Sequence, residues 1–521
     1  MKSAVLFAST PREKSYHCSK NYGIYRVAHE IRNLNIQTQV VQFFNRFSYD
    51  EIDKILINYV NQDTLVVGFG TIFWDAYSKK ERQSTLEKFE YICEQVKIKY
   101  PHIQIIIGGP GVAAVLNDTY AEHVDAYFKG LSEQDIPNYM IALRDGLPIP
   151  KPASYTKNIP TYNSMHGEFD FTRSFTTYEH NDFITPYDVP ILEVARGCIF
   201  KCAFCAYMLN GKKKFDYIKD KEVLKKELIE NYENHGVTNY ILSDDTLNDS
   251  DYKINLLHET FTSLPFELTF SAYLRLDLLH SHKNQIPLLK EMGLIGAYFG
   301  VETFNKNAGK IIGKSLGEKQ KDFIAELKDV HWGKRVKMAV GLITGLPNED
   351  YESHEKAMDW ISDKNNNVDR VTANALVISD PSRSYNPWQS DFQKKSKDYG
   401  YNWPTENIYD WRNSKGPVKS FEEAQVIQKQ YQERINDTVR VKLGGFALSR
   451  DYSWLGSQKN GKSINELIDM DRFEYTKYVK QAENDTTIEQ DYIDTYKQKV
   501  LTYRFKNETK TSRNRHHISQ L

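Results

Sequence analysis

VARGCIFKCAFC, residues 194–205, holds three of the five cysteines of this 521-residue chain. The spacing of Cys198, Cys202 and Cys205 is C-x3-C-x2-C, and the triplet follows an apolar run over residues 189–197 that predicts a strand. A secreted disulfide framework would be denser, even-numbered and spread along the chain. The triplet therefore points to a metal site rather than to disulfide bonds.

Three thiolates on one loop can bind three irons of a cubic iron–sulfur cluster. The fourth iron is then left without a protein thiolate, and an open position is typical of catalytic rather than structural metal sites. One alternative is a zinc ion whose site is completed by a distant histidine, although the chain has no second C-x2-C pair. The other alternative is three buried cysteines without a metal.

The triplet opens a series of alternating strand-like and helix-like segments. The predicted strands cover residues 189–197, 239–245, 267–273, 296–302, 336–345 and 369–378. Helix-like stretches separate them, and six strand–helix units predict a partial or full TIM-type α/β barrel. We expect this domain to span residues 187–385.

Residues 1–150 show the same alternation. The predicted strands are 3–9, 38–44, 64–70 and 103–109, with helices over 22–34 and 78–101. This order predicts an α/β fold, a doubly wound parallel sheet of Rossmann-like type. Ligands of such sheets lie outside the carboxyl ends of the strands, here at Ser9 to Thr10, Gly68 to Thr71 and Gly108 to Gly111.

The remaining segments have less regular patterns. Residues 151–186 begin Pro-rich and lack a clear period, which predicts a long linker that crosses the surface. Residues 386–521 contain helix-like stretches at 420–437 and 464–484. We expect this region to be a mainly helical cap that covers the barrel mouth and shapes the substrate pocket.

Composition excludes some classes of protein. Lys and Arg number 68 and Asp and Glu 69, a net charge of −1, which argues against a surface built to hold a nucleic-acid polymer. No apolar run approaches the roughly 18 residues of a membrane helix. The N-terminus lacks the pattern of a signal peptide, so we expect a cytoplasmic protein without a membrane partner.

From about residue 190 to 385 the chain resembles the radical S-adenosylmethionine superfamily. The resemblance rests on the C-x3-C-x2-C triplet with an aromatic residue before its last cysteine, and on weaker motifs that follow in the same order. These motifs are Ser243-Asp244-Asp245-Thr246, Arg275, Gly300-Val301-Glu302-Thr303 with Lys314, and Gly341 to Glu349. The set is similar to the branch with an N-terminal cobalamin-binding domain.

The resemblance implies a [4Fe-4S] cluster on Cys198, Cys202 and Cys205. Its fourth iron would chelate S-adenosylmethionine, and reductive cleavage would release a 5′-deoxyadenosyl radical. The S-adenosylmethionine residues implied are Phe204, Ala206, Tyr207, Glu302, Gly341 and Gly345. We expect a small-molecule substrate and an electron donor such as flavodoxin or ferredoxin as partners of this chain.

Each of these roles has a structural alternative. Phe204 would lie against the adenine, or it could only pack the loop. Glu302 would bind the ribose hydroxyls or the methionine amino group, or it could pair with Arg275 inside the barrel. Gly341 and Gly345 would let the backbone approach the adenine.

Three strand-end residues are candidates for catalysis. Asp244 and Asp245 end the second barrel strand, and Arg275 ends the third. Charged residues at the carboxyl ends of barrel strands are typical of function. The alternative for the two aspartates is a helix N-cap.

The first domain also resembles the cobalamin-binding domain of this branch. The implied cobalamin residues are Thr10, Gly68, Thr71, Gly108, Gly109, Gly130 and Glu133. The Asp-x-His-x-x-Gly motif that ligates cobalt is absent, because no Asp lies two residues before His17. This departure argues against cobalt ligation by His17 and leaves an empty first domain as an alternative.

The leading hypothesis is therefore a cobalamin-dependent radical enzyme. Most members with this architecture transfer a methyl group to an unactivated carbon, and some oxidise or rearrange their substrate. A second hypothesis is a radical enzyme with an empty first domain that abstracts hydrogen directly. The remote alternative is a zinc-stabilised nucleic-acid-binding protein that uses the basic tail after residue 502.

Overall fold

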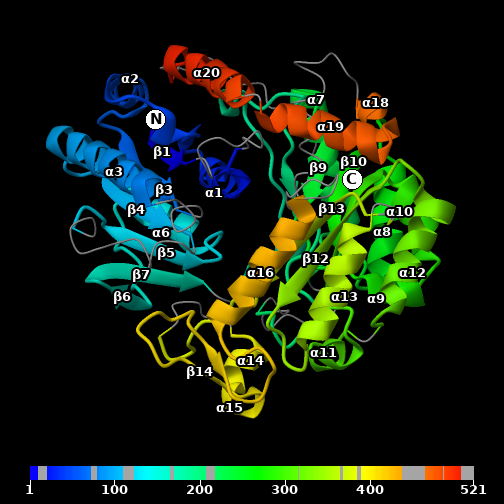
Figure 1. Cartoon of the computed structure of the whole chain (residues 1–521). Helices are drawn as coiled ribbons and strands as arrows, with labels where there is room; N and C mark the ends of the chain where they lie inside the picture. Colours follow the sequence, from blue (N-terminus) through cyan, green and yellow to red (C-terminus); the bar gives the residue numbers. More distant parts are fainter. Residues whose placement is uncertain are drawn as a thin grey trace.

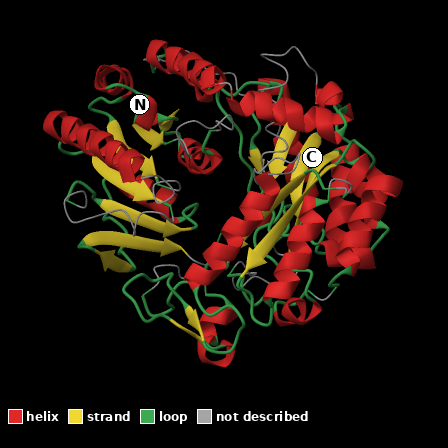
Figure 2. Ribbon diagram, in the orientation of Figure 1, coloured by secondary structure: helices red, strands yellow, loops and turns green. Residues whose placement is uncertain are grey.

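The chain forms two parallel sheets, which we call sheet A and sheet B. The computed structural model describes residues 1–9, 20–71, 79–109, 122–164, 169–206, 217–314, 316–363, 366, 368–383, 389–436, 464–484 and 486–505. Sheet A comes from the N-terminal third and sheet B from the middle of the chain, and they lie on opposite sides of the molecule (Figure 1). Helices lie along both sheets (Figure 2).

Sheet A has seven strands in the order β2-β1-β3-β4-β5-β7-β6. The strands are β1 Ser3–Ala8, β2 Gln37–Val41, β3 Thr64–Gly70, β4 Gln104–Gly108, β5 Ala126–Gly130, β6 Ser154–Thr156 and β7 Ile159–Ser164. Only β6 and β7 pair antiparallel. The order reverses between β1 and β3, the switch point near which such sheets bind ligands.

Helices cover both faces of sheet A, which confirms the doubly wound fold. They are α1 Tyr22–Asn33, η1 Phe44–Arg46, α2 Tyr49–Tyr59, α3 Lys79–Lys99 and α6 Asp135–Asp145. Successive side chains of a strand point to opposite faces, so Leu6 of β1 joins the core that contains Ile24 of α1 and Ile136 of α6. Phe7 joins the core that contains Ile55 and Phe89 on the opposite face.

The prediction of an irregular surface linker over residues 151–186 is wrong for much of that segment. β6 and β7 form a hairpin that extends sheet A, because β7 pairs in parallel with β5. Two short 3₁₀ turns follow, η2 Phe171–Arg173 and η3 His180–Asp182.

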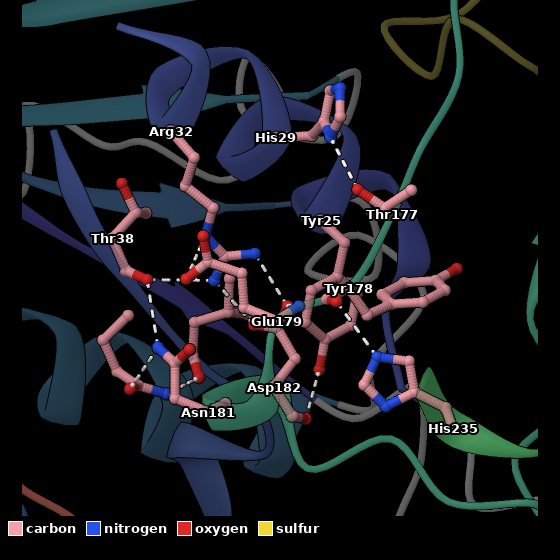
Figure 3. Close-up of polar contacts among 12 residues, drawn as sticks. Tyr25, His29, Arg32, Thr38, Thr177, Tyr178, Glu179, Asn181, Asp182 and His235 are labelled. Atoms are coloured by element: carbon pink, nitrogen blue, oxygen red, sulfur yellow. Dashed lines mark hydrogen bonds and ion pairs between the residues drawn. The ribbon is translucent and has the colours of Figure 1, made fainter. Parts of the chain in front are cut away.

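Figure 3 shows residues 177–182 packed against α1 and β2. Arg32 donates from both terminal nitrogens to the buried carboxylate of Asp182, at 2.7 Å each. The hydroxyl of Tyr25 donates to the Asp182 carbonyl at 3.4 Å, and His235 contacts the Tyr178 carbonyl at 3.0 Å. A bidentate buried pair of this kind fixes the connection to the first domain.

Sheet B is an open sheet of six parallel strands in the order β13-β12-β11-β10-β9-β8. The strands are β8 Ile191–Leu192, β9 Asn239–Leu242, β10 Thr269–Leu274, β11 Leu294–Glu302, β12 Lys337–Thr344 and β13 Arg370–Ala375. Strand order follows chain order, as in a barrel, so the predicted partial barrel is confirmed. The first strand is much shorter than predicted, because residues 193–195 leave the sheet and Ala195 bridges Ile218 instead.

Helices alternate with the strands of sheet B. They are α7 Lys221–His235, α8 Asp251–Thr262, α9 Leu276–Ser281, α10 Gln285–Glu291, α11 Lys306–Ile311, α12 Lys319–Glu326 with the π-helical turn η4 Leu327–Trp332, and α13 Tyr351–Ser362. Their apolar side chains and the outward side chains of the strands, such as Phe299 and Val340, share one core.

The C-terminal region is mainly helical, as predicted. Its elements are α14 Asp391–Lys394, α15 Ser396–Tyr399, β14 Tyr401–Asn402, β15 Arg412–Asn413, α16 Phe421–Asn436, α18 Ile464–Asp469, α19 Arg472–Asn484 and α20 Thr486–Thr502. α16 packs on β12, β13 and α13. The expectation that the whole region caps the barrel is wrong for α20, which lies on the first domain beside α2 (Figure 1).

In the described part of the chain, none of the helices combines the length and the apolar character that a membrane crossing needs.

Candidate functional site

The predicted site residues of the second domain meet at the carboxyl ends of sheet B. The cysteine loop follows β8, Asp244 and Asp245 follow β9, Arg275 follows β10, Glu302 ends β11, and Gly345 follows β12. In a parallel sheet these ends lie along one edge, which is where barrel enzymes carry their active sites.

The cysteine loop is held by its flanks and by neighbouring strand ends. The Arg196 amide donates to the Tyr217 carbonyl at 2.9 Å, and the Cys205 amide donates to the Cys202 carbonyl at 2.9 Å. The Cys198 thiol donates to the Thr246 hydroxyl at 3.5 Å, and Arg275 donates to the Cys202 sulfur at 3.4 Å. Both contacts place the loop against the ends of β9 and β10.

The only group of three close His, Cys, Asp or Glu ligand atoms among the described residues lies outside the cysteine loop. Those atoms belong to Glu90, Glu94 and His123 and lie within 4.8 Å of one another. The cysteine loop, with its C-x3-C-x2-C spacing, stays the predicted cluster site.

Arg275 does not pair with Glu302, so that structural alternative is wrong. Its guanidinium binds the Asp277 carboxylate at 2.6 Å, donates to the Gly313 carbonyl at 2.8 Å, and lies over the Phe200 ring at 4.4 Å. These contacts leave one terminal nitrogen on the Cys202 sulfur. Arg275 is therefore a cationic neighbour of the cysteine loop.

Glu302 lies in a second polar corner beside the loop. Its backbone φ is +62°, a left-handed conformation that non-glycine residues seldom adopt and that often marks functional sites. Lys314 Nζ binds the Glu302 carboxylate at 2.9 Å and the Gly300 carbonyl at 2.6 Å, and it lies 5.9 Å from the centre of the Phe204 ring. The structure thus brings together Phe204, Glu302 and Lys314, while half-buried Ala206 follows Cys205.

The two predicted S-adenosylmethionine glycines have close protein neighbours. A Cβ atom on Gly341 would lie 2.1 Å from the Tyr298 hydroxyl, which crosses above it to reach Thr372 at 2.9 Å. Gly345 has φ +88°, and a Cβ there would lie 2.8 Å from Ala424 and 3.2 Å from Trp411. Packing therefore accounts for both glycines, and their contact with adenine stays a prediction.

Asp244 and Asp245 are adjacent but differ in burial and in their ion-pair partners. Asp244 is fully buried and binds Lys253 at 2.9 Å, and Lys253 also binds Asp249 at 2.9 Å. Burial, opposed by Lys253, raises the pKa of Asp244 to about 6. Asp245 reaches solvent, but crowding by protein atoms and the charge of Asp244 raise its pKa to about 7. Asp245 is thus the better placed of the two for proton transfer near neutral pH.

Sequence reasoning missed Lys253, on which this network depends. Lysine is seldom fully buried, and the only signal is its position four residues after Asp249, on the first turn of α8. The Asp244 carboxylate also accepts from the Thr246 amide at 3.1 Å. The turn that carries Thr246 to the Cys198 thiol is therefore held by a buried ion pair.

A cavity of about 490 Å³ lies between the carboxyl ends of sheet A and the start of sheet B. This volume is within the roughly 300–1,000 Å³ of small-molecule and cofactor sites. Sheet A contributes six of the predicted cobalamin residues, Gly68, Thr71, Gly108, Gly109, Gly130 and Glu133. The second domain contributes Ile191 of β8, Glu193 and Arg196 after β8, and Ser243 after β9. Thr10, His17 and Tyr207 lie outside the described residues.

The wall of the cavity is mostly apolar, and charged residues such as Glu133 and Arg196 are also part of it. Gly68 is required by packing, because a Cβ there would lie 2.8 Å from Leu6. The Thr71 hydroxyl donates to the Gly108 carbonyl at 2.9 Å and ties β3 to β4. Glu133 has one carboxylate oxygen on Arg196 at 2.7 Å, while the other is buried with no hydrogen-bond partner in the described structure.

Residues 192–361 match the Radical SAM superfamily, so this segment is a radical SAM domain. No curated protein matches the chain by sequence. The structure of the radical S-adenosylmethionine methyltransferase TsrM from Kitasatospora setae, with cobalamin and a [4Fe-4S] cluster bound, has a TM-score of 0.55 at 13% identity, over 78% of this chain and 76% of that chain. The cobalamin-dependent S-adenosylmethionine radical enzyme OxsB, with aqua-cobalamin and S-adenosylmethionine bound, has a TM-score of 0.54 at 13% identity, over 95% of this chain and 67% of that chain. At these identities the likeness is one of fold.

Proposed function

We propose that this radical SAM domain works with cobalamin held in the first domain, and that the enzyme methylates, or else oxidises or rearranges, an unactivated carbon of a small molecule. The observation that carries the proposal is the cavity, because the predicted cobalamin residues and the flank of the cysteine loop line the same space. A methyl donor in the first domain would then face the radical site in the second.

The residues present fit the two cofactors of the radical SAM domain. Cys198, Cys202 and Cys205 would hold the cluster, and Arg275 and Thr246 restrain two of their sulfurs. Phe204 and the Glu302–Lys314 pair would hold S-adenosylmethionine. When bound and reduced, this cofactor pair supplies a 5′-deoxyadenosyl radical. The chain itself binds, orients and excludes water, and Asp245 can hold a proton near neutral pH.

The chemistry of the cavity lining supports cobalamin as the occupant. The unpartnered oxygen of Glu133 requires a donor, because a buried polar atom without a hydrogen bond is costly. The amide groups around a corrin ring are donors of the right kind. None of the described lining residues is a histidine, so the described part of the chain supplies no imidazole to cobalt there.

The test is anaerobic reconstitution with iron, sulfide and hydroxocobalamin, followed by incubation with S-adenosylmethionine and dithionite. We expect 5′-deoxyadenosine to show radical chemistry and S-adenosylhomocysteine beside it to show methyl transfer. Cys202→Ala should abolish both products. Cys93→Ala is the matched control, because Cys93 is buried in α3 away from the loop and its loss should leave both products in place.

Each outcome separates the hypotheses. Deoxyadenosine without bound corrinoid would favour the enzyme with an empty first domain and direct hydrogen abstraction. Deoxyadenosine formation by Cys202→Ala would contradict the cluster site. One zinc and no iron in protein purified under argon would favour the zinc-binding alternative.

A further inference from the structure

Arg196 joins the cysteine loop to the first domain. It lies two residues before Cys198. The residue before it, Ala195, bridges Ile218 where the sequence predicted the end of a longer strand. Its Nη2 binds Glu133 of the first domain at 2.7 Å, and its Nε binds Glu193 of the second at 2.6 Å. One guanidinium therefore spans the two sheets next to the first cysteine.

The pair is buried on both sides. The side chains of Arg196 and Glu133 are 13% and 6% exposed, and the guanidinium lies 4.8 Å from the centre of the Phe171 ring. Arginine suits this position because its planar fork can bind two carboxylates at once. Removal of Arg196 would leave the buried Glu133 carboxylate with Arg26 at 3.9 Å as its nearest cation in an ion pair, so the position of Glu133 depends on Arg196.

The backbone of Arg196 passes this constraint to the cysteines. Its amide donates to the Tyr217 carbonyl, and Ala195 bridges Ile218. Gly197, with φ +94°, then turns the chain into Cys198. A shift of the Arg196 side chain would therefore move the backbone that leads into Cys198, because only Gly197 separates the two residues.

Glu133 lines the cavity and also binds Arg196. One oxygen binds Arg196, and the other is buried, unpartnered and part of the residue that lines the cavity. Arg26 Nε lies 3.9 Å from the first oxygen, and Arg26 binds Glu30 at 2.7 Å. A donor that enters the cavity and binds the free oxygen would change how firmly Glu133 holds Arg196.

We propose that Glu133 and Arg196 are positioning residues that couple the occupancy of the first-domain cavity to the geometry of the cluster loop. The inference rests on the proposed function, because the occupant is taken to be cobalamin with its amide donors. Coupling between two binding sites is reciprocal. Cobalamin should therefore change the affinity for S-adenosylmethionine, and S-adenosylmethionine should change the affinity for cobalamin by the same factor.

The experiment measures binding, not turnover. The Kd of S-adenosylmethionine is determined by anaerobic equilibrium dialysis on cluster-loaded protein, with and without hydroxocobalamin, and the electron paramagnetic resonance spectrum of the reduced cluster is recorded in both states. We expect the wild type to change its Kd at least ~5-fold and to change its spectrum. Glu133→Gln keeps the shape but loses the charge, and its coupling should fall below twofold when it is measured at hydroxocobalamin concentrations that saturate the variant.

Glu30→Gln is the matched control. It removes a carboxylate from Arg26 at the edge of the same charged group without touching Arg196, so its coupling should equal that of the wild type. If Glu133→Gln fails to load iron, Arg196→Lys replaces it, because a lysine cannot bind both carboxylates in the same way. The same loss of coupling is expected.

Three results would overturn the inference or its basis. Full coupling in the variant that loads iron would show that the pair does not transmit occupancy. A wild type that binds cobalamin without any change in Kd or spectrum would remove the coupling but leave the proposed function. A wild type that binds no corrinoid would overturn the proposed function itself.

Discussion

Glu349, four residues after Gly345, carries a carboxyl group where a charge is costly. It is 2% exposed and accepts a hydrogen bond from the Thr303 hydroxyl. Its other oxygen lies 3.9 Å from His354 Nε2, and neither atom has a hydrogen-bond partner in the described structure. Burial raises the pKa of Glu349 to about 8 and lowers that of His354 to about 4. Both side chains are therefore neutral at pH 7.

This environment makes stability fall as pH rises. Between the ordinary glutamate pKa near 4.5 and about 8, the folded state keeps a proton that the unfolded state has lost. The free energy of unfolding then decreases with pH. At about 1.4 kcal/mol per unit of pKa shift, the loss amounts to several kcal/mol. Glu349→Gln should remove this slope. The free energy of unfolding of the variant, relative to that of the wild type, should therefore rise from pH 5 to pH 9.

The measurement is the urea midpoint of both proteins at pH 5, 7 and 9. Glu352→Gln, on the exposed side of α13, is the control and should follow the wild type at every pH. Parallel curves for Glu349→Gln and the wild type would mean that Glu349 is ionised in the folded protein.

Among the elements, the end of β12 connects the barrel to the C-terminal helices. The Thr344 hydroxyl donates to the Ala424 carbonyl of α16 at 2.7 Å, and Trp411 donates to the Leu376 carbonyl at 2.8 Å. Gly345 lies between these contacts with φ +88° and no room for a side chain. The turn therefore seats α16 against sheet B.

Gly345→Ala should weaken this junction. A left-handed alanine costs roughly 1–2 kcal/mol, and the overlap with Ala424 and Trp411 should add about 1–3 kcal/mol. Gly146→Ala is the matched control, because Gly146 has φ +67° and nothing within 4 Å of its Cβ position. Calorimetry should show a clearly larger drop in melting temperature for Gly345→Ala. Equal drops would show that α16 moves aside without cost.

The elements also show what the sequence could predict. Strands β1 to β4 of sheet A and the strands of sheet B were predicted because continuous apolar runs bury both faces of parallel strands. β5 was not predicted, and β8 is much shorter than its apolar run. The β6–β7 hairpin was missed because the edge strand β6 has only 3 residues and β7 has no continuous apolar run. Its turn places Lys157 and Asn158 at φ +48° and +66°, a geometry for which Asn-Gly is the usual signal.

The features of the candidate site also divide into those that the sequence could predict and those that it could not. Motifs at strand ends were predictable, because parallel strands bring their carboxyl ends together whatever the details of packing. Contacts between distant elements were not, and so the Glu133–Arg196 pair, the buried Lys253 and the Arg275 contact with Cys202 emerge only from the structure. The Arg275–Glu302 alternative failed because Arg275 binds Asp277 at the start of α9, while Glu302 binds Lys314 after α11.

At the scale of the whole molecule, the C-terminal helix α20 packs against the N-terminal domain. Its apolar side chains, such as Ile493, join the core of sheet A that contains Ile55 of α2. Tyr496 accepts a hydrogen bond from the Gln42 amide at 2.9 Å, and Lys497 binds Glu51 at 2.9 Å. Since α16 packs on sheet B, the C-terminal region holds both halves of the molecule (Figure 1).

One buried node links α20 to the cavity. Asp188 accepts from the Tyr492 hydroxyl at 2.6 Å and from Lys20 at 2.9 Å, and Lys20 lines the cavity. Lys20 also donates to the Phe183 carbonyl at 2.8 Å. A single carboxylate therefore joins the C-terminal helix, the connection between the sheets and the cavity wall.

Tyr492→Phe should loosen this node without a change of shape. Loss of a buried hydrogen bond to a charged group should lower the free energy of unfolding by about 1.5–3 kcal/mol. Lys497→Gln, which breaks a partly exposed ion pair on the same helix, should cost at most about 1 kcal/mol. Amide hydrogen exchange should quicken in α20 and in β1 and β2 beneath it, because they share one core. Exchange in β10 to β12 should stay as in the wild type, and equal acceleration there would show that α20 stabilises the chain globally rather than through the first domain.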